Sequence, residues 1–385
     1  MNPLSRLLTI SQFEKQERGL IYTPREIAQQ PATWQVTHRL FEELRGELQA
    51  FLRQAKSGRW TIYLVGAGTS DYIGQAVANL LRKSWGCEVA AVPSTDLLSN
   101  RDELIIPDRN YLWISFSRSG DSPEGVAVLE QALASTPKIR HLVVSCNKNG
   151  RMVKLAQKSE GSCAVVLDDA VNDGSLAMTS SFTNMVIFGL ELAHLWDNTP
   201  FEETLDRLTL AAEYMLEDGA VLAHSLAQGG YRRACFVGAG ALAAAARESA
   251  LKLLELTSGE IQTTYETTLG LRHGPMSSLN RDTLFTSFIS TDDRRRRYDS
   301  DLLKEIRDKQ AVRSIVAVGA ANPSSDYSLH CAAFDDLADA YRTPVGIIFS
   351  QMLGLFSSIE LGLMPDSPSP NGIISRVVET FAIYD

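Results

Sequence analysis

A run of hydroxyl side chains follows one apolar, strand-like stretch and could bind a phosphate. Ser117, Arg118 and Ser119 end that stretch, and Ser122 stands directly before Pro123. Serine at the N-cap and proline at the first helical position are typical of a helix start. Free backbone N–H groups, hydroxyl donors and the positive end of the helix dipole would then meet at one point, which favours an anion. The alternative is an ordinary capped helix after a tight turn.

A second pair of hydroxyls, Thr69 and Ser70, follows the turn Gly66-Ala-Gly68 after another strand-like stretch. Because both groups leave the ends of strands, we favour a phosphate site over a simple helix cap. The Gly-Lys-Ser/Thr of a Walker loop is missing, and no third glycine completes the dinucleotide pattern G-x-G-x-x-G. The pattern therefore indicates a phosphate and gives little support to a dinucleotide.

Candidates for acid–base chemistry lie further along the chain. Glu248, Lys252 and Glu255 are four and three residues apart in a helical pattern, so they share one face. By itself this spacing is typical of a solvated, charged stripe with a Glu248–Lys252 ion pair. His273 follows a strand-like run in the loop 270–275, where function is more common than in a core, although a lone loop histidine is often simply exposed. The other histidines have no metal-ligand spacing.

The elements that position these residues occur twice. Gly238 stands 172 residues after Gly66 in a second Val-Gly-Ala-Gly turn, and the strand-like runs that follow keep the same spacing. A period this long indicates a duplicated domain. After the third strand the second copy has Asp292, Asp293 and four arginines in place of the serines. These acidic residues would repel a phosphate, so we expect one anion site served by both domains.

Short β-branched runs alternate with helical patterns in both copies, which predicts parallel sheets covered by helices on both faces. Ligands of such sheets lie at the carboxyl ends of the strands. The predicted fold is α/β, with two tandem three-layer α/β/α domains, each with a five-stranded parallel sheet, after an amphipathic helical segment. The predicted strands are 60–66, 88–93, 111–116, 141–146 and 163–168 in the first copy, and 233–239, 261–266, 283–289, 314–319 and 330–335 in the second.

We divide the chain into a helical N-terminal segment (1–57), a phosphate-binding domain (58–205), a domain with the catalytic helix and histidine loop (206–365) and a tail (366–385). The tail has a Pro-rich arm and then a β-like run, and it could fold back over a site.

Composition narrows the class of protein. The chain has 385 residues, enough for two domains, and 44% of them are hydrophobic. No apolar stretch reaches the length of a membrane span, and the start lacks a signal peptide. Five scattered cysteines predict reduced core residues in a cytoplasmic protein. A net charge of −9 argues against nucleic-acid or membrane binding, so an anionic substrate needs a local site.

Four motifs in order resemble the sugar isomerase (SIS) family in its tandem form: Gly-Ala-Gly-Thr-Ser, Ser-x-Ser-Gly-x-Ser, Glu-Ser-Ala-Leu-Lys-Leu-x-Glu and Arg-His-Gly-Pro. The likeness covers about residues 60 to 385 and includes the isomerase half of glucosamine-6-phosphate synthase, whose amidotransferase half is missing here. Gln30, Pro31 and Trp34, together with the stretch 177–183, also resemble bacterial galactosamine-6-phosphate (tagatose-6-phosphate) deaminase/isomerases.

The resemblance implies a role for each matching residue. Glu255 would move protons at C1 and C2, with Lys252 one turn before it. His273 would open the sugar ring and would be donated by a neighbouring subunit. The resemblance implies phosphate or substrate binding by Ser117, Arg118, Ser119, Ser122, Thr69, Ser70, Thr179 and Ser180. In the tail, Arg376 stands where the synthase has a Schiff-base lysine, and a guanidinium cannot form an imine with a carbonyl.

The expected activity is a deaminating aldose–ketose isomerase that converts galactosamine 6-phosphate and water to tagatose 6-phosphate and ammonia. No metal or organic cofactor is expected, and a donated histidine would require at least a homodimer. The alternatives are a fructosamine-6-phosphate deglycase, an isomerase that retains the amine, and a non-catalytic sugar-phosphate sensor.

Overall fold

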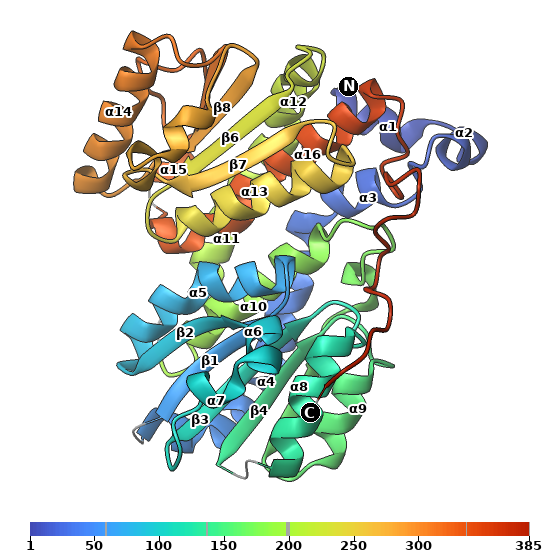
Figure 1. Ribbon diagram of the computed structural model, residues 1–385, viewed down its shortest axis with the longest axis vertical. Coiled ribbons are helices and arrows are strands. Elements are labelled where there is room, and N and C mark those ends of the chain that lie inside the picture. The colour runs from blue at the N-terminus through green and yellow to red at the C-terminus, as the bar shows by residue number, and fades with distance from the viewer. Residues whose placement is uncertain (58–59, 136–137, 198–200, 336, 385) are drawn as a thin grey trace. The chain divides into compact units, whose positions relative to one another are not determined.

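Two parallel sheets organise the chain, which we describe from a computed structural model (Figure 1). The structure describes residues 1–57, 60–135, 138–197, 201–335 and 337–384. The chain forms two compact units, each described here by itself. The first-sheet unit comprises Thr33–Asp173, Ser180–Glu202 and Ser375–Asp385. The second-sheet unit comprises Met1–Ala32, Gly174–Thr179 and Glu203–Ile374. The N-terminal segment therefore divides at Thr33.

The first sheet has five parallel strands in the order β2-β1-β3-β4-β5. These strands are β1 (Trp60–Gly66), β2 (Glu88–Pro93), β3 (Asn110–Ser117), β4 (Ile139–Ser145) and β5 (Ser162–Val166). Its helices are α4 (Gln30–Ser57), α5 (Thr69–Trp85), α6 (Ser94–Ser99), α7 (Arg101–Leu104), α8 (Pro123–Ser135), α9 (Arg151–Lys158), η1 (Asp169–Val171) and α10 (Ser180–Ala193). Helix α5 contacts β1 and β2 and is itself covered by α10.

The second sheet repeats this topology in the order β7-β6-β8-β9-β10. Its strands are β6 (Arg233–Gly238), β7 (Gln262–Thr267), β8 (Thr283–Phe288), β9 (Ser314–Val318) and β10 (Tyr327–Leu329). The helices are α1 (Pro3–Thr9), α2 (Gln12–Glu17), α3 (Thr23–Ala28), α11 (Glu202–Tyr214), the π-helix η2 (Met215–Gly219), α12 (Ala220–Ala227), α13 (Leu242–Leu256), η3 (Gly270–Arg272), η4 (Pro275–Ser278), α14 (Asp293–Asp308), α15 (Ala332–Asp335), η5 (Asp339–Tyr341) and α16 (Thr343–Glu360).

The predicted α/β fold with two five-stranded parallel sheets is confirmed, and the repeated glycine turn has a structural cause. A Cβ on Gly66 would come within 2.4 Å of the backbone carbon of Ser70, and one on Gly238 within 2.4 Å of the backbone oxygen of Leu242. Only glycine allows the strand and the following helix to approach so closely. The two copies therefore keep this glycine for the turn itself, whether or not a phosphate binds there.

Two sequence predictions were wrong. The segment 330–335 is not a strand: β10 ends at Leu329, and Ala332–Asp335 form the short helix α15. The alanines favour a helical turn, which buries Phe334 beneath the Arg342 guanidinium. The β-like run in the tail forms no strand over 373–384. No strand edge pairs with it there, and Arg376 is held through side-chain hydrogen bonds instead.

Other features agree with the composition. All five cysteines are free, with Cys146 and Cys235 buried. No helix among the described residues has the length and apolar character that a membrane span requires.

His141 in β4 gives the first prediction. Its ring is buried edge-on against Trp113, and neither nitrogen has a hydrogen-bond partner among the described residues. Burial, with a smaller effect from Arg101, lowers the pKa of His141 to about 4. The unfolded chain therefore binds more protons between pH 6.5 and 4, so the free energy of unfolding falls as the pH falls through that window.

His141→Phe keeps the ring and removes this titration. We expect the variant to lose less stability than the wild type between pH 6.5 and 4, by up to about 3 kcal/mol. Urea unfolding at a series of pH values measures the difference. His330→Phe, at a partly exposed histidine, is the control. If the free energy of unfolding falls by the same amount in wild type and in His141→Phe between pH 6.5 and 4, the prediction is wrong.

Candidate functional site

The predicted phosphate loop, 117–122, lies between β3 and α8. Strand β3 ends at Ser117, and α8 begins at Pro123, directly after Ser122, as the sequence predicted. The backbone N–H of Gly120 donates to the Ser117 hydroxyl over 3.0 Å, and that of Asp121 donates to the Ser119 hydroxyl over 3.2 Å. Gly120 has a φ of +66°, which favours glycine. These bonds fix the loop ahead of the positive end of the α8 dipole.

Residues that were not predicted from the sequence hold this loop from the turn after β4 and from the start of α9. The Asn147 side chain donates to the Ser119 carbonyl over 2.8 Å, and the backbone N–H of Met152 donates to the Gly120 carbonyl over 2.9 Å. A Cβ on Gly150 would come within 2.7 Å of the Ser119 carbonyl oxygen. The available signal was the sequence Asn147-Lys-Asn-Gly150, which is rich in turn formers directly after a strand.

Thr69 and Ser70 lie at the same edge of the first sheet. They are the first residues of α5, which follows β1, and β1 pairs with β3. The carboxyl ends of parallel neighbours meet at one edge, so both predicted hydroxyl groups are brought to it. Thr69 and Ser70 are nevertheless largely buried.

Arg118 contacts the tail. Its Nη2 donates to the Arg376 carbonyl over 2.5 Å. Arg376 in turn donates from Nε to the Asp173 carbonyl over 2.7 Å and from Nη2 to Asn172 Oδ1 over 2.8 Å. In the first-sheet unit, the tail is thus tied directly to the residue that follows Ser117. Direct contact between Arg118 and a phosphate stays a prediction.

Thr179 and Ser180 are fully buried. The Ser180 hydroxyl donates to Asp173 Oδ1 over 2.6 Å, and the same carboxylate accepts from the backbone N–H of Ser181 over 2.8 Å. The Trp34 indole donates to Thr183 Oγ1 over 3.0 Å. The tryptophan motif and the 177–183 stretch therefore fit together, with Asp173 as a further organiser. Substrate contact by Thr179 and Ser180 stays a prediction.

The charged face of α13 is not a solvated stripe, so that interpretation was wrong. Glu248 and Lys252 are fully buried, and the Glu255 side chain is 22% exposed. The Lys252 ammonium contacts Glu255 Oε2 and lies 3.4 Å from Glu248 Oε1. The helix buries this face because α13 packs between the sheet strands and α16.

This arrangement suits proton transfer. One Glu255 oxygen is held by an ammonium, and the carboxylate remains partly open to solvent. Burying an ammonium costs several kcal/mol unless carboxylates compensate it, and here two do. A buried charged group of this kind is more typical of a functional site than of a surface helix.

His273 is exposed after η3, in the loop that follows β7. Its backbone N–H donates to the Gly270 carbonyl over 2.9 Å, and Pro275 begins η4 directly after Gly274. The imidazole has no hydrogen-bond or ion-pair partner among the described residues. The histidine is therefore presented on a stiffened turn and is available to a group outside its own loop.

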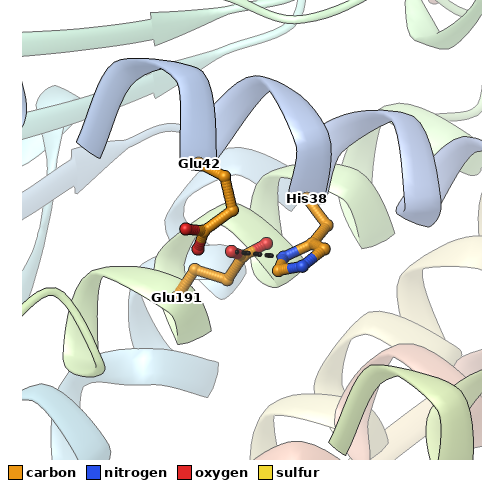
Figure 2. A group of neighbouring side chains, drawn as sticks. All are labelled: His38, Glu42 and Glu191. Atoms are coloured by element: carbon orange, nitrogen blue, oxygen red, sulfur yellow. Dashed lines mark hydrogen bonds and ion pairs between the residues drawn. The ribbon is translucent and has the colours of Figure 1, made fainter. Parts of the chain in front are cut away.

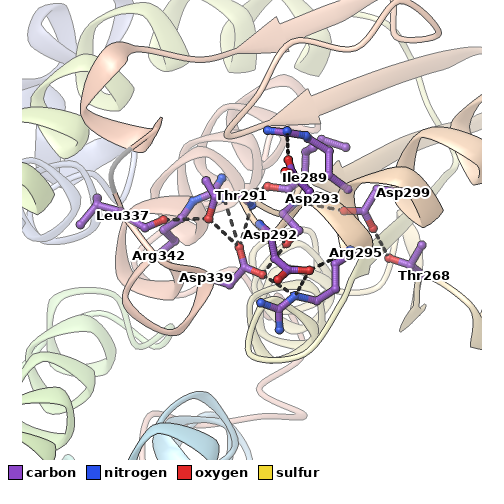
Figure 3. Close-up of polar contacts among 12 residues, drawn as sticks. Thr268, Ile289, Thr291, Asp292, Asp293, Arg295, Asp299, Leu337, Asp339 and Arg342 are labelled. Atoms are coloured by element: carbon purple, nitrogen blue, oxygen red, sulfur yellow. Dashed lines mark hydrogen bonds and ion pairs between the residues drawn. The ribbon is translucent and has the colours of Figure 1, made fainter.

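The second copy has a carboxylate where the first copy has the loop 117–122 (Figure 3). After β8, the hydroxyl of Ser290 donates to Asp339 Oδ2 over 2.5 Å, and the backbone N–H of Thr291 donates to Asp339 Oδ1 over 2.9 Å. Arg295 and Arg342 form ion pairs with the same carboxylate. The Ser290 hydroxyl and the Thr291 backbone N–H, which could otherwise bind a phosphate, are therefore already occupied.

Two more aspartates complete this network. Asp299 accepts from the Ser290 backbone N–H over 2.9 Å, and Asp292 caps α14 by accepting from the Arg295 backbone N–H over 3.0 Å. Asp292 was recognisable from the sequence, whereas Asp339, which lies 47 residues later in the chain, was not. The occupied donors support a single phosphate site, in the first copy.

The comparisons agree with this architecture. Residues 55–195 match the model of the SIS domain. D-galactosamine-6-phosphate deaminase AgaS of Escherichia coli is 34% identical over 376 residues, which cover 94% of this chain and 95% of that protein. The chain belongs to the SIS family.

Solved SIS structures show the same tandem fold. The structure of tagatose-6-phosphate ketose/aldose isomerase from Escherichia coli aligns with a TM-score of 0.82 and 32% identity over 91% of this chain and 95% of that one. The C-terminal domain of glucosamine-fructose-6-phosphate aminotransferase from Francisella tularensis aligns with a TM-score of 0.73 over 90% and 98% of the two chains. At 19% identity this second likeness concerns the fold alone.

Substitutions in the loop 117–122 test the phosphate site. Ser117→Ala and Ser119→Ala each remove a hydroxyl donor to an ionised group, worth about 1.5–3 kcal/mol, so KM for the sugar phosphate should rise about 10- to 150-fold. Inorganic phosphate should inhibit the wild type competitively. Ser290→Ala is the matched control, because its hydroxyl is occupied by Asp339. Unchanged ligand affinity of the double variant in isothermal titration would contradict the assignment.

Proposed function

We propose that this SIS protein is a galactosamine-6-phosphate deaminase and isomerase, which releases ammonia and forms tagatose 6-phosphate. The buried Lys252 between Glu248 and Glu255 carries the proposal, because it supplies an acid–base group in a chain that also has a phosphate loop. Relatives named for deamination and for ketose/aldose isomerisation support it. One reaction that removes the amine and moves the carbonyl from C1 to C2 accounts for both names.

The phosphate loop orients the substrate, and His273 opens its ring. Ser117, Ser119 and Ser122 bind the 6-phosphate, which fixes the sugar and converts binding energy into orientation. A neutral imidazole can give a proton to one oxygen and take one from another. His273 therefore moves the proton between O1 and O5, which breaks the C1–O5 bond and exposes the C1 aldehyde.

Glu255 then performs the isomerisation. It takes the proton from C2, the C2 electron pair forms a C1–C2 double bond, and the aldehyde oxygen takes a proton from water to become an enol hydroxyl. Glu255 returns the proton to C1, which leaves an iminium at C2. Water adds to C2 and ammonia leaves, giving the ketose. The Lys252 ammonium contacts Glu255 and stabilises the negative charge that develops on the aldehyde oxygen as the C2 proton leaves. Acid–base catalysis of this kind contributes about 10²–10⁴-fold.

The contacts of Arg376 favour an amino-aldose over a ketose held as an imine. Its guanidinium donates to Asp173 and Asn172, so it serves to hold the tail. No Schiff base is needed when the substrate itself carries the amine at C2. We place the reaction in the cytoplasm, in a homodimer in which each subunit supplies His273 to the site of the other.

A parallel assay tests the function. Galactosamine, glucosamine and fructosamine 6-phosphates are each incubated with the enzyme, and ammonia and ketose are both measured. We expect both products from galactosamine 6-phosphate, in equal amounts and with the highest kcat/KM. An isomerised product that keeps its amine, with no ammonia released, would indicate simple isomerisation. Cleavage of fructosamine 6-phosphate would indicate a deglycase. Binding of a sugar phosphate without turnover would indicate a sensor.

A further inference from the structure

Three side chains that the proposed reaction does not use meet between α4 and α10 (Figure 2). His38 and Glu42 lie one turn apart on α4, and Glu191 projects toward them from α10. His38 Nδ1 lies 2.9 Å from Glu191 Oε2, and one ligand atom of each residue lies within 4.8 Å of the others. All three belong to the first-sheet unit.

Glu191 is incompletely satisfied. Its side chain is fully buried, and Oε1 has no hydrogen-bond partner among the described residues. A buried carboxylate oxygen without a partner is costly, and a single histidine offers only one donor to the group. The site therefore has an open position for a cation.

We propose that His38, Glu42 and Glu191 bind one divalent transition-metal ion of the zinc class. One imidazole nitrogen and two carboxylate oxygens are a donor set that zinc accepts, with water as a fourth ligand. The ion replaces the proton that His38 and Glu191 share, and it supplies the missing partner of Glu191 Oε1. Small side-chain rotations bring the ligand atoms to metal distances of about 2 Å.

Arg45 determines how tightly the ion binds. Its guanidinium contacts both Glu42 oxygens, at 2.5 and 3.0 Å, and donates from Nη1 to the backbone carbonyls of His194 and Leu195. Glu42 must give up part of the ion pair to reach the metal, while the backbone contacts keep Arg45 in place. Glu42 is the adjustable ligand, and Arg45 competes with the ion for it.

The ion would cross-link helix α4 to helix α10. Helix α10 begins at Ser180, within the stretch 177–183 and directly beside the Asp173 carboxylate. The metal therefore has a structural role and takes no part in proton transfer at Glu255. Sequence spacing did not reveal the site, because Glu191 lies 153 residues after His38.

Metal titration of tag-free, chelator-treated full-length protein tests the proposal. Zinc measured by elemental analysis after dialysis should reach one equivalent per chain. Zinc at about a hundredfold over its Kd should raise Tm by about 3–6 °C. Deaminase turnover should be the same with and without zinc. A protein that binds no zinc but still turns over would contradict the metal site alone, and one that binds zinc without turnover would contradict the proposed function alone.

Four variants locate the ion. Glu191→Gln and His38→Gln should each lower zinc affinity at least about 30-fold, which cuts the Tm shift at the same zinc concentration to about a third or less. Arg45→Gln should raise zinc affinity by freeing Glu42. Glu42→Gln should also lower zinc affinity, and because this side chain is half-exposed the substitution does not disturb the core. His330→Gln is the matched control, because His330 forms a 2.7 Å pair with Asp335 and no third ligand joins them among the residues that the structure describes. Absence of stoichiometric zinc, or equal binding by wild type and Glu42→Gln, would overturn the proposal.

Discussion

Replacing Glu255 with glutamine is expected to lower kcat about 10²–10⁴-fold while the sugar phosphate still binds. Glutamine keeps the shape of the side chain, and its amide oxygen can still accept a hydrogen bond from the buried Lys252 ammonium. It cannot take a proton from C2. Steady-state kinetics on galactosamine 6-phosphate and a separate binding titration measure the two effects.

Solvent isotope exchange identifies the step. In deuterated water, the wild type should place deuterium at C1 of the ketose product, and residual product from Glu255→Gln should form correspondingly slowly. Glu260→Gln, at an exposed glutamate just beyond α13, is the matched control and should retain wild-type kcat. Near-normal turnover of Glu255→Gln would mean that the buried Lys252 cluster is only structural.

Mixing inactive His273→Ala with inactive Glu255→Gln is expected to restore activity once subunits exchange. The exposed His273 is presented on a turn stiffened by Pro275, so it can serve the site of a neighbouring chain. In a random dimer mixture, half of the dimers are mixed and each has one intact site. About a quarter of wild-type sites should therefore return.

The control uses two groups of the same helix. Lys252 and Glu255 contact one another within one chain, so mixing Lys252→Met with Glu255→Gln should restore nothing. Native mass spectrometry establishes that subunits have exchanged. An inactive His273→Ala and Glu255→Gln mixture with proven exchange would place His273 in the site of its own chain.

The sequence by itself determined the repeated α/β architecture and the position of the loop 117–122 between a strand and a helix start. Buried strands and helix starts are encoded by residues close in the chain, so apolar runs and caps predict them. Strands 60–66 and 88–93 were predicted to the residue, and α8 begins at Pro123 as its Ser-Pro start indicates. The motif at Glu255 and the loop of His273 were also identified, although their roles stay predictions.

Only the tertiary structure decided which of these groups are buried and what they contact. The spacing of Glu248 and Lys252 is the same in a solvated stripe and in a buried cluster, and packing against α16 distinguishes the two. Asp339 binds Ser290 in the second copy, and Glu191 contacts His38 in the first-sheet unit. In both pairs the two residues lie far apart in the chain. Such pairings depend on how distant elements pack, and no local periodicity encodes them.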